Sequence, residues 1–245
     1  MEKTHPRPYG RLLRWSFLLA AIGLLWPHLT ARVLAPTSTP AAVLSESGHP
    51  YKFLSANAKG PATWPCATPI DVAVNLAALD SASRRSFLAD LSASLRSLEQ
   101  NSHYTFRLLG ETSAVPTKSW GFDWVKYTPR AQVVVAVIPF QASDLATEHG
   151  AAIGGSYFNP DTDGRLRSFA GYVVIQSERF FDYVPGSGHM SHQALITHEM
   201  LHVLNLDHVD DPASLLTERL SHSDGHLGPG DLAGLEALYA SSCSN

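Results

Sequence analysis

Three histidines and one glutamate near position 200 have the types and the spacing that a hydrolytic metal site needs. His198 and His202 are four residues apart, so a helix would present both imidazoles on one face, one turn apart. Two such nitrogens can bind one Zn²⁺ at about 2.0–2.1 Å. Glu199 follows the first histidine and would lie beside the metal, where a carboxylate can take a proton from a bound water. The pattern predicts metal-assisted hydrolysis with Glu199 as the general base.

A third ligand would come from His208, six residues beyond His202. The helix must end before it, because a continuing helix would turn His208 away from the metal. Asn205 stands where the chain must leave the helix, and Asn tolerates left-handed backbone better than any residue except Gly. Three protein ligands leave one position for water, which is the composition of a catalytic rather than a structural zinc site. The sequence therefore predicts a zinc site formed by His198, His202 and His208.

The run from His198 to His208 resembles the extended zinc signature of the metzincin metallopeptidases, His-Glu-x-x-His-x-x-Gly-x-x-His. It matches at every defined position except Asn205, which takes the place of Gly. The alternative interpretation is an exposed, histidine-rich helix end, since the chain has 12 histidines. The resemblance implies a zinc-dependent endopeptidase in which Glu199 is the general base and acid and a peptide substrate binds in extended conformation.

The C-terminal segment resembles one branch of the metzincins, the matrixins. Residues 227–239 (LGPGDLAGLEALY) look like the end of a matrixin domain, in which an Asp-bearing turn begins the last helix. Residues 64–66 (WPC), before a predicted strand, are similar to the opening of secreted matrixin-like proteins of the actinobacterial type. The resemblance implies an α+β, metzincin-like fold: a twisted mixed β-sheet, an active-site helix that carries the zinc motif, and a C-terminal helix.

One position after the third histidine departs from the metzincin pattern. Metzincins carry a Met there, in a tight turn that forms an apolar floor beneath the metal, whereas the aligned residue here is Leu216. Leu for Met keeps volume and apolarity, a change that usually costs less than about 1.5 kcal/mol. Leu216 and Asn205 leave a second hypothesis open, a non-catalytic zinc-stabilised module that binds peptides or cell-wall proteins. Glu199 argues against it, because such a module does not need a carboxylate beside the metal.

The hydrophobic patterns predict the elements that position these residues. The run 132–138 (QVVVAVI) is almost entirely apolar and β-branched, so it should be a central strand covered on both faces. A helix over 83–100 would carry five large apolar residues on one stripe. Asp231 fits the N-cap of the last helix. Strands are expected at 70–76, 104–109, 132–138 and 172–176, and helices at 83–100, 192–204 and 231–242.

Composition indicates one domain with appendages. The chain has 245 residues, 44% of them hydrophobic, and a formal net charge of −4. Basic residues cluster only within the first 14, so no nucleic-acid partner is expected. Residues 36–50 are small, polar and Pro-bearing, which is typical of a flexible linker. Residues 51–245 are the predicted metzincin-like domain, and we expect it to be a monomer.

Residues 1–35 are interpreted as a signal peptide or an N-terminal membrane anchor. Four basic residues precede an uncharged apolar run of 12, residues 15–26, which Pro27 follows. That length is typical of a signal-peptide core and is short for a membrane span, which needs about 20 residues. The sequence therefore predicts a protein that is secreted, or tethered to the outer face of the cell membrane by an uncleaved segment.

The two cysteines, Cys66 and Cys243, lie near the two ends of the predicted domain. In an exported chain such a pair is typical of a disulfide, and the alternative is two separate thiols.

Two segments before the zinc motif carry weaker signals. Residues 159–164 (NPDTDG) have alternating oxygen ligands that could bind Ca²⁺, but position 170 is Ala rather than the expected Glu, which favours a hairpin turn. Residues 154–157 stand where matrixins have the edge strand that pairs with substrate, which suggests β-addition of an extended peptide.

Overall fold

The structure is a computed structural model that describes residues 40–119, 131–146, 150–182, 191–217 and 225–243. All of these residues belong to one compact unit, residues 34–245. The predicted signal or anchor segment, residues 1–35, lies outside the described residues. Among the helices that are described, none is long and apolar enough to cross a membrane.

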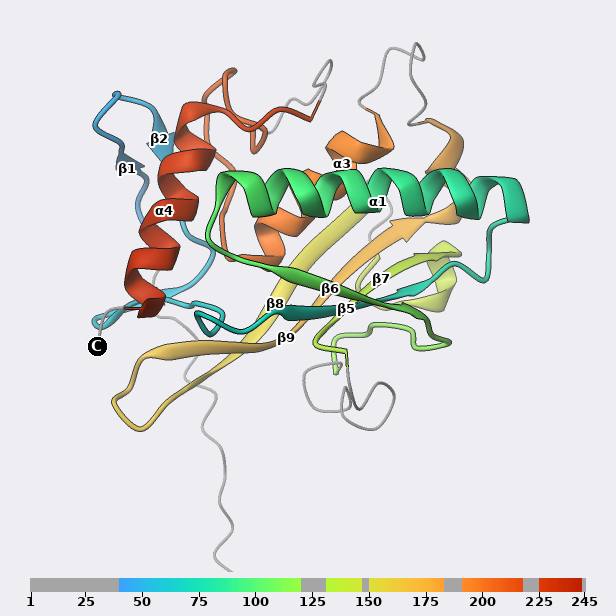
Figure 1. The fold of residues 1–245 in the computed structure, drawn as a ribbon, viewed down its shortest axis with the longest axis horizontal. Helices are drawn as coiled ribbons and strands as arrows, with labels where there is room; N and C mark the ends of the chain where they lie inside the picture. Colours follow the sequence, from blue (N-terminus) through green and yellow to red (C-terminus); the bar gives the residue numbers. More distant parts are fainter. Residues whose placement is uncertain (1–39, 120–130, 147–149, 183–190, 218–224, 244–245) are drawn as a thin grey trace, which may run out of the picture. The chain divides into compact units, whose positions relative to one another are not determined.

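A five-stranded mixed sheet is the framework of this unit (Figure 1). Its strand order is β6-β5-β7-β9-β8, with β8 antiparallel to β9 and the other neighbours parallel. The strands are β5 (Ile70–Asn75), β6 (Phe106–Glu111), β7 (Val133–Ile138), β8 (Ala152–Pro160) and β9 (Leu166–Gln176). The predicted strands are confirmed, although β6 begins two residues later than expected and β9 begins six residues earlier.

Within the described residues, three helices accompany the sheet: α1 (Ser81–Asn101), α3 (His192–Val203) and α4 (Pro229–Cys243). Short 3₁₀ segments, η1 (Phe140–Ala142) and η2 (Ser177–Asp182), follow β7 and β9. The predicted α+β class is confirmed, with a zinc-motif helix and a C-terminal helix in the expected places. The last helix begins at Pro229, because Pro is favoured in the first turn. Asp231 therefore lies inside the helix. The prediction that it is the N-cap is wrong.

Apolar side chains cover both faces of the central strand β7, as the composition of residues 132–138 predicted. Every residue of β7 is buried. Alternate residues such as Val133 and Val135 belong to the larger core, which includes α1 and α3, and Figure 1 shows both helices on that face. Val134 and Ala136 belong to a smaller core with Ala114 and other residues of the connecting segments. The two-sided burial explains why the strand lacks polar alternation.

Helix α1 holds α3 in place along the larger core. The carboxylate of Asp80 caps α1 by accepting hydrogen bonds from the Ala82 and Ser83 N–H groups. The buried stripe includes one small polar residue, Ser94, whose hydroxyl donates to the Gln193 carbonyl at the start of α3. A small residue at this point allows close approach of the two helices.

The N-terminal part of the described chain contains two short hairpins. Strands β1 (Val43–Leu44) and β2 (Pro50–Tyr51) pair, as do β3 (Ala56–Asn57) and β4 (Gly60–Pro61). The first hairpin lies largely inside residues 36–50, the range predicted as linker, whose small polar residues carry no strand signal. Beyond the hairpins, fully buried Trp64 donates from Nε1 to the Val203 carbonyl at 2.8 Å. This segment is therefore attached to the last turn of α3.

Strand β8 meets α3 at Gly154, where no side chain fits. A Cβ atom on Gly154 would overlap the backbone carbonyl of Glu199. The edge strand can approach the zinc-motif helix this closely only because residue 154 is Gly.

We therefore expect Gly154→Ala to force α3 and β8 apart. Overpacking of this kind typically destabilises a domain by about 1–3 kcal/mol, which urea unfolding of the full chain would measure. Ser156→Ala, on the same strand, is the control and should cost much less. A Gly154→Ala protein as stable as the Ser156→Ala protein would contradict the close packing described here.

Candidate metal centre

The structure brings the three predicted histidines together at one point. The Nε2 atom of His198 lies 3.1 Å from Nε2 of His202 and 3.1 Å from Nε2 of His208, and the last two are 3.2 Å apart. Three nitrogens at about 2.0–2.1 Å from one tetrahedral ion would be separated by about 3.4 Å, close to the spacing observed. Among the described residues, no other group of three or more His, Cys, Asp or Glu side chains has a geometry that could hold a metal ion.

The opposite ring nitrogens show why the contact between His198 and His202 is not an ordinary hydrogen bond. Nδ1 of His198 lies 2.8 Å from the Leu215 carbonyl oxygen, and Nδ1 of His202 lies 2.7 Å from that of Leu206. A carbonyl only accepts, so in both rings Nδ1 carries the proton and Nε2 presents a lone pair. Converging lone pairs repel each other unless a cation lies between them. This donor set fits a metal ion, plausibly zinc.

Burial keeps the first two histidines neutral. It lowers the pKa of His198 to about 3 and that of His202 to about 4, because water is excluded from both rings. Neutral imidazole is the form that binds a metal. The two side chains are therefore ready to act as ligands over the whole physiological pH range.

Glu199 is buried on the same helix. Desolvation raises the pKa of its carboxyl to about 8, against a hydrogen bond from the Gly154 N–H that favours the ionised form. A carboxyl with a pKa near neutrality can both accept and donate a proton in that range. A cation on the adjacent histidines would favour the carboxylate, because opposite charges attract.

The chain leaves α3 through a left-handed turn, as the spacing predicted. Asn205 has a φ of 86°, and its N–H donates to the His202 carbonyl. The Leu206 N–H donates to the Leu201 carbonyl. This pair of bonds is a Schellman motif, whose left-handed position is usually Gly. The turn brings His208 back toward the two helical histidines.

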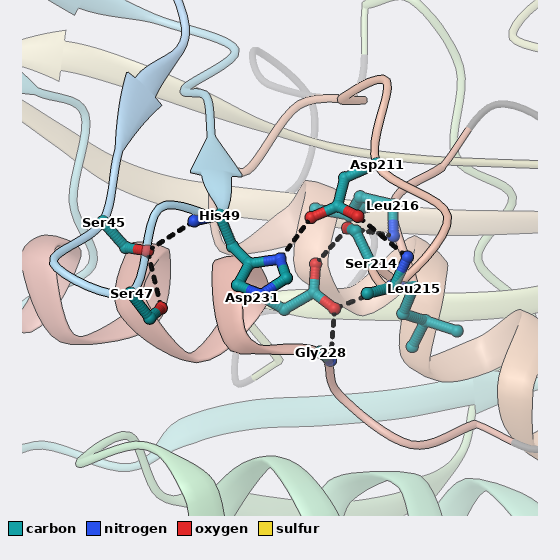
Figure 2. A network of polar contacts seen from close by, with 10 residues as sticks. Ser45, Ser47, His49, Asp211, Ser214, Leu215, Leu216, Gly228 and Asp231 are labelled. Carbon is teal, nitrogen blue, oxygen red and sulfur yellow. Dashed lines mark hydrogen bonds and ion pairs between the residues drawn. The ribbon is translucent and has the colours of Figure 1, made fainter.

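Residues 211–216, the segment that follows the third histidine, are held by a buried carboxylate (Figure 2). Asp231 of α4 accepts from the Ser214 hydroxyl at 2.6 Å and from the Leu215 and Gly228 N–H groups at 2.7 Å. Burial raises the pKa of Asp231, although all three donors favour the ionised form. Leu215 is the residue whose carbonyl orients His198. Helix α4 thus holds Leu215, the hydrogen-bond partner of His198, through the side chain of Asp231.

Leu216 occupies the position predicted for the apolar floor. It is 2% exposed and belongs to the larger core. Its carbonyl accepts from the N–H of Val209, the residue directly after His208, at 3.1 Å. A buried apolar residue therefore stands at the position that the resemblance assigns to the metzincin Met, hydrogen-bonded to the residue that follows the third histidine.

Sequence reasoning missed the contribution of the first hairpin to this segment. His49, next to β2, lies 2.8 Å from a carboxylate oxygen of Asp211 through Nδ1 (Figure 2). Hydrogen bonds from the Ala213 N–H and from His49 lower the pKa of Asp211. His49 and Asp211 are separated by 162 residues, so no local pattern could have indicated the contact.

In the possible calcium-binding segment, residues 159–164, the carboxylate of Asp161 is hydrogen-bonded within the protein. Residues 161–165 form the turn between β8 and β9, as the Asp-Gly pattern favoured. One Asp161 oxygen accepts from the Asp163 and Arg165 N–H groups, and the other accepts from Arg167. These bonds explain Asp161 without a calcium ion, and Ca²⁺ binding stays a prediction.

The two cysteines are adjacent thiols in the structure. The pKa of Cys66 is raised, first by a hydrogen bond with Cys243 and then by desolvation. The structure thus places the pair together but does not show the predicted disulfide.

Comparison with models of known protein families gives no match, and comparison with curated proteins also gives none. The assignment of the site therefore depends on its own residues. The mixed sheet, the helix and the buried triad with its His-Glu-x-x-His…His spacing are consistent with a metzincin-like zinc site.

Metal-free protein should lose stability as the pH falls below about 6.5. The unfolded chain protonates His198 and His202 near their ordinary pKa of 6.5, whereas the folded chain resists protonation to about 3 and 4. The unfolded state then binds more protons, and each histidine contributes a slope of up to about 1.4 kcal/mol per pH unit. Glu199 acts in the opposite sense between its ordinary pKa of 4.5 and about 8, where only the folded state keeps its proton.

Urea unfolding of chelator-treated Glu199→Gln protein between pH 5 and 7 would isolate the histidine contribution. A second protein that also carries His198→Gln and His202→Gln is the control, and its stability should depend less steeply on pH. Equal slopes for the two proteins would show that the buried histidines are not held neutral.

Proposed function

We propose that this protein is a zinc-dependent endopeptidase of the metzincin class, with a matrixin-like domain. The observation that carries the proposal is the convergence of three imidazole Nε2 atoms beside a buried glutamate on the same helix. Three ligands leave one coordination position open, which structural zinc sites do not. A structural site also has no need for Glu199.

Each residue then has a defined task. His198, His202 and His208 would hold a zinc ion, which when bound supplies Lewis-acid activation of a water molecule and of the peptide carbonyl. Glu199 takes a proton from that water as the oxygen attacks the carbonyl carbon. It gives the proton to the amine nitrogen as the C–N bond breaks. The carbonyls of Leu215 and Leu206 keep two of the rings oriented through their Nδ1 protons.

An extended peptide is the proposed substrate form. Strand β8 is at the edge of the sheet, paired with β9 on one side only among the described strands. It also contacts the helix that carries Glu199. A peptide paired with β8 by backbone hydrogen bonds would therefore lie near the triad.

We also propose that the protein acts outside the cytosol, secreted or tethered by its N-terminal segment. The support is the basic and apolar pattern of residues 1–26. In an oxidising compartment the adjacent thiols of Cys66 and Cys243 would form the disulfide that the sequence suggested. That bond would join the segment between β4 and β5 to the end of α4.

Glu199→Gln should reduce cleavage of a denatured protein substrate by at least about 10²-fold, since general acid–base catalysis typically contributes about 10²–10⁴. Zinc content should remain one ion per chain, because Gln keeps the size of the side chain and no ligand is changed. Glu236→Gln, on the exposed surface of α4, is the matched control and should cleave normally. His208→Ala should lose both zinc and activity.

Chelator-resistant cleavage, or a Glu199→Gln protein as active as wild type, would refute the peptidase proposal. Stoichiometric zinc without cleavage in the wild-type protein would instead favour the non-catalytic binding module. Both measurements use the full chain.

A further inference from the structure

We propose that Asn205 is a positioning residue for the third histidine, acting through its side chain as well as its backbone. The inference rests on the proposed zinc site, because it concerns how His208 is held there. Position 205 needs a left-handed residue, and Gly would satisfy that need without a side chain. The side chain of Asn205 must therefore be explained separately from the turn.

The Asn205 side chain joins the turn to the N-terminal segment through three hydrogen bonds. Its Oδ1 accepts from the Ser55 N–H, and its Nδ2 donates to the Ser55 and Ala62 carbonyls, each at 2.9 Å. Asn205 is only 2% exposed. The two partner residues flank the β3–β4 hairpin, so one amide closes both ends of that hairpin onto the turn. Gly could form none of these bonds.

The same segment holds the two residues between Asn205 and His208. The Leu54 N–H donates to the Asn205 carbonyl at 3.0 Å, and the Asp207 N–H donates to the Lys52 carbonyl at 2.8 Å. Between them, Leu206 and Phe53 form a bridge. The Lys52 ammonium also lies 2.6 Å from the Asp207 carboxylate. Asn205 and Asp207 are therefore hydrogen-bonded to residues 52–55, and Leu206 is held between them opposite Phe53.

Two hydrogen bonds connect residues 206 and 207 to the histidines. Leu206, held opposite Phe53, supplies the carbonyl that orients His202. Asp207, held by Lys52, accepts from the N–H of His208 at 2.8 Å. Residues 52–55 together with Ala62 thus act as a brace for the second and third histidines. Asn205 is its central attachment, because it alone contributes three side-chain bonds.

Asn205→Gly in the full chain removes the side-chain bonds but retains a residue that readily adopts the left-handed backbone. We expect zinc to leave this protein at least about ten times faster than wild type, because removing groups behind metal ligands typically costs about 10–100-fold in affinity. Transfer of zinc to a chromogenic chelator measures the rate. With Co²⁺ in place of zinc, the visible absorption spectrum should also change, because it reports ligand geometry.

Asn57→Gly is the matched control, since it makes the same substitution in the β3–β4 hairpin. The Asn57 side chain donates to the Gly164 carbonyl and accepts from the Lys59 N–H, both in exposed surroundings. This protein should release zinc at the wild-type rate and keep the wild-type cobalt spectrum. Lys52→Met loosens the brace from its other side and should accelerate release by a smaller factor.

Wild-type zinc release and an unchanged cobalt spectrum in Asn205→Gly would overturn the proposal. A lower melting temperature of the metal-free protein without either change would identify a merely structural residue, and would overturn it too. If Asn205→Gly does not fold, Lys52→Met decides, and wild-type release from that protein counts against the brace. No readout uses a substrate, so lack of peptidase activity would refute the proposed function and leave this inference standing. A wild-type chain that binds no metal would overturn this inference together with the proposed zinc site, before any variant is compared.

Discussion

The arrangement of this site depends on three imidazole nitrogens that converge at one point, two of them with lone pairs directed at each other. Without a cation such a group is repulsive, so the fold has to hold each ring from outside. Helix α3 supplies two rings and is itself fixed by α1, by β8 at Gly154 and by Trp64. Carbonyls from two different segments then orient the rings through Nδ1. The positions of those carbonyls decide whether the three Nε2 atoms meet.

Two supports outside the sheet hold the carbonyls. Residues 52–55 and Ala62 hold the turn that contains Leu206, through Asn205 and through Lys52 with Asp207. Helix α4 holds Leu215 through Asp231, and the first hairpin meets the same segment through His49 and Asp211 (Figure 2). Segments from both ends of the domain therefore hold the centre. The adjacency of Cys66 and Cys243 places a potential covalent link between those ends.

Local chemistry explains which features the sequence predicted. The i, i+4 histidines and the helix-stopping Asn205 are separated by fewer than two turns of helix, so their geometry follows from helix dimensions alone. The apolar run 132–138 identified the central strand for a similar reason, because burial on both faces leaves no polar position. The left-handed turn at Asn205 was predicted, but its side-chain partners, up to 150 residues distant in sequence, were not.

The features that the sequence did not predict correctly share a physical cause. Strand β9 begins at Leu166 although residues 166–171 include Arg167 and Gly171, because pairing with β8 rather than local propensity extends it. The β1–β2 hairpin formed in a stretch of linker composition, where tertiary contacts such as His49 with Asp211 add to its own pairing. The sequence indicated that Asp231 is an acidic residue near the start of a helix, but it did not indicate its partners Ser214 and Leu215. Long-range polar contacts leave no periodic trace in a sequence.

The most direct test of this account is X-ray absorption spectroscopy at the zinc edge of the metal-loaded full chain. The account predicts three imidazole nitrogens and a fourth, non-imidazole ligand that binds through oxygen or nitrogen, all at about 2.0–2.1 Å. The fourth ligand should be exchangeable. Sulfur at about 2.3 Å, or a fourth imidazole, would contradict it, because either would close the position at which the proposed chemistry occurs.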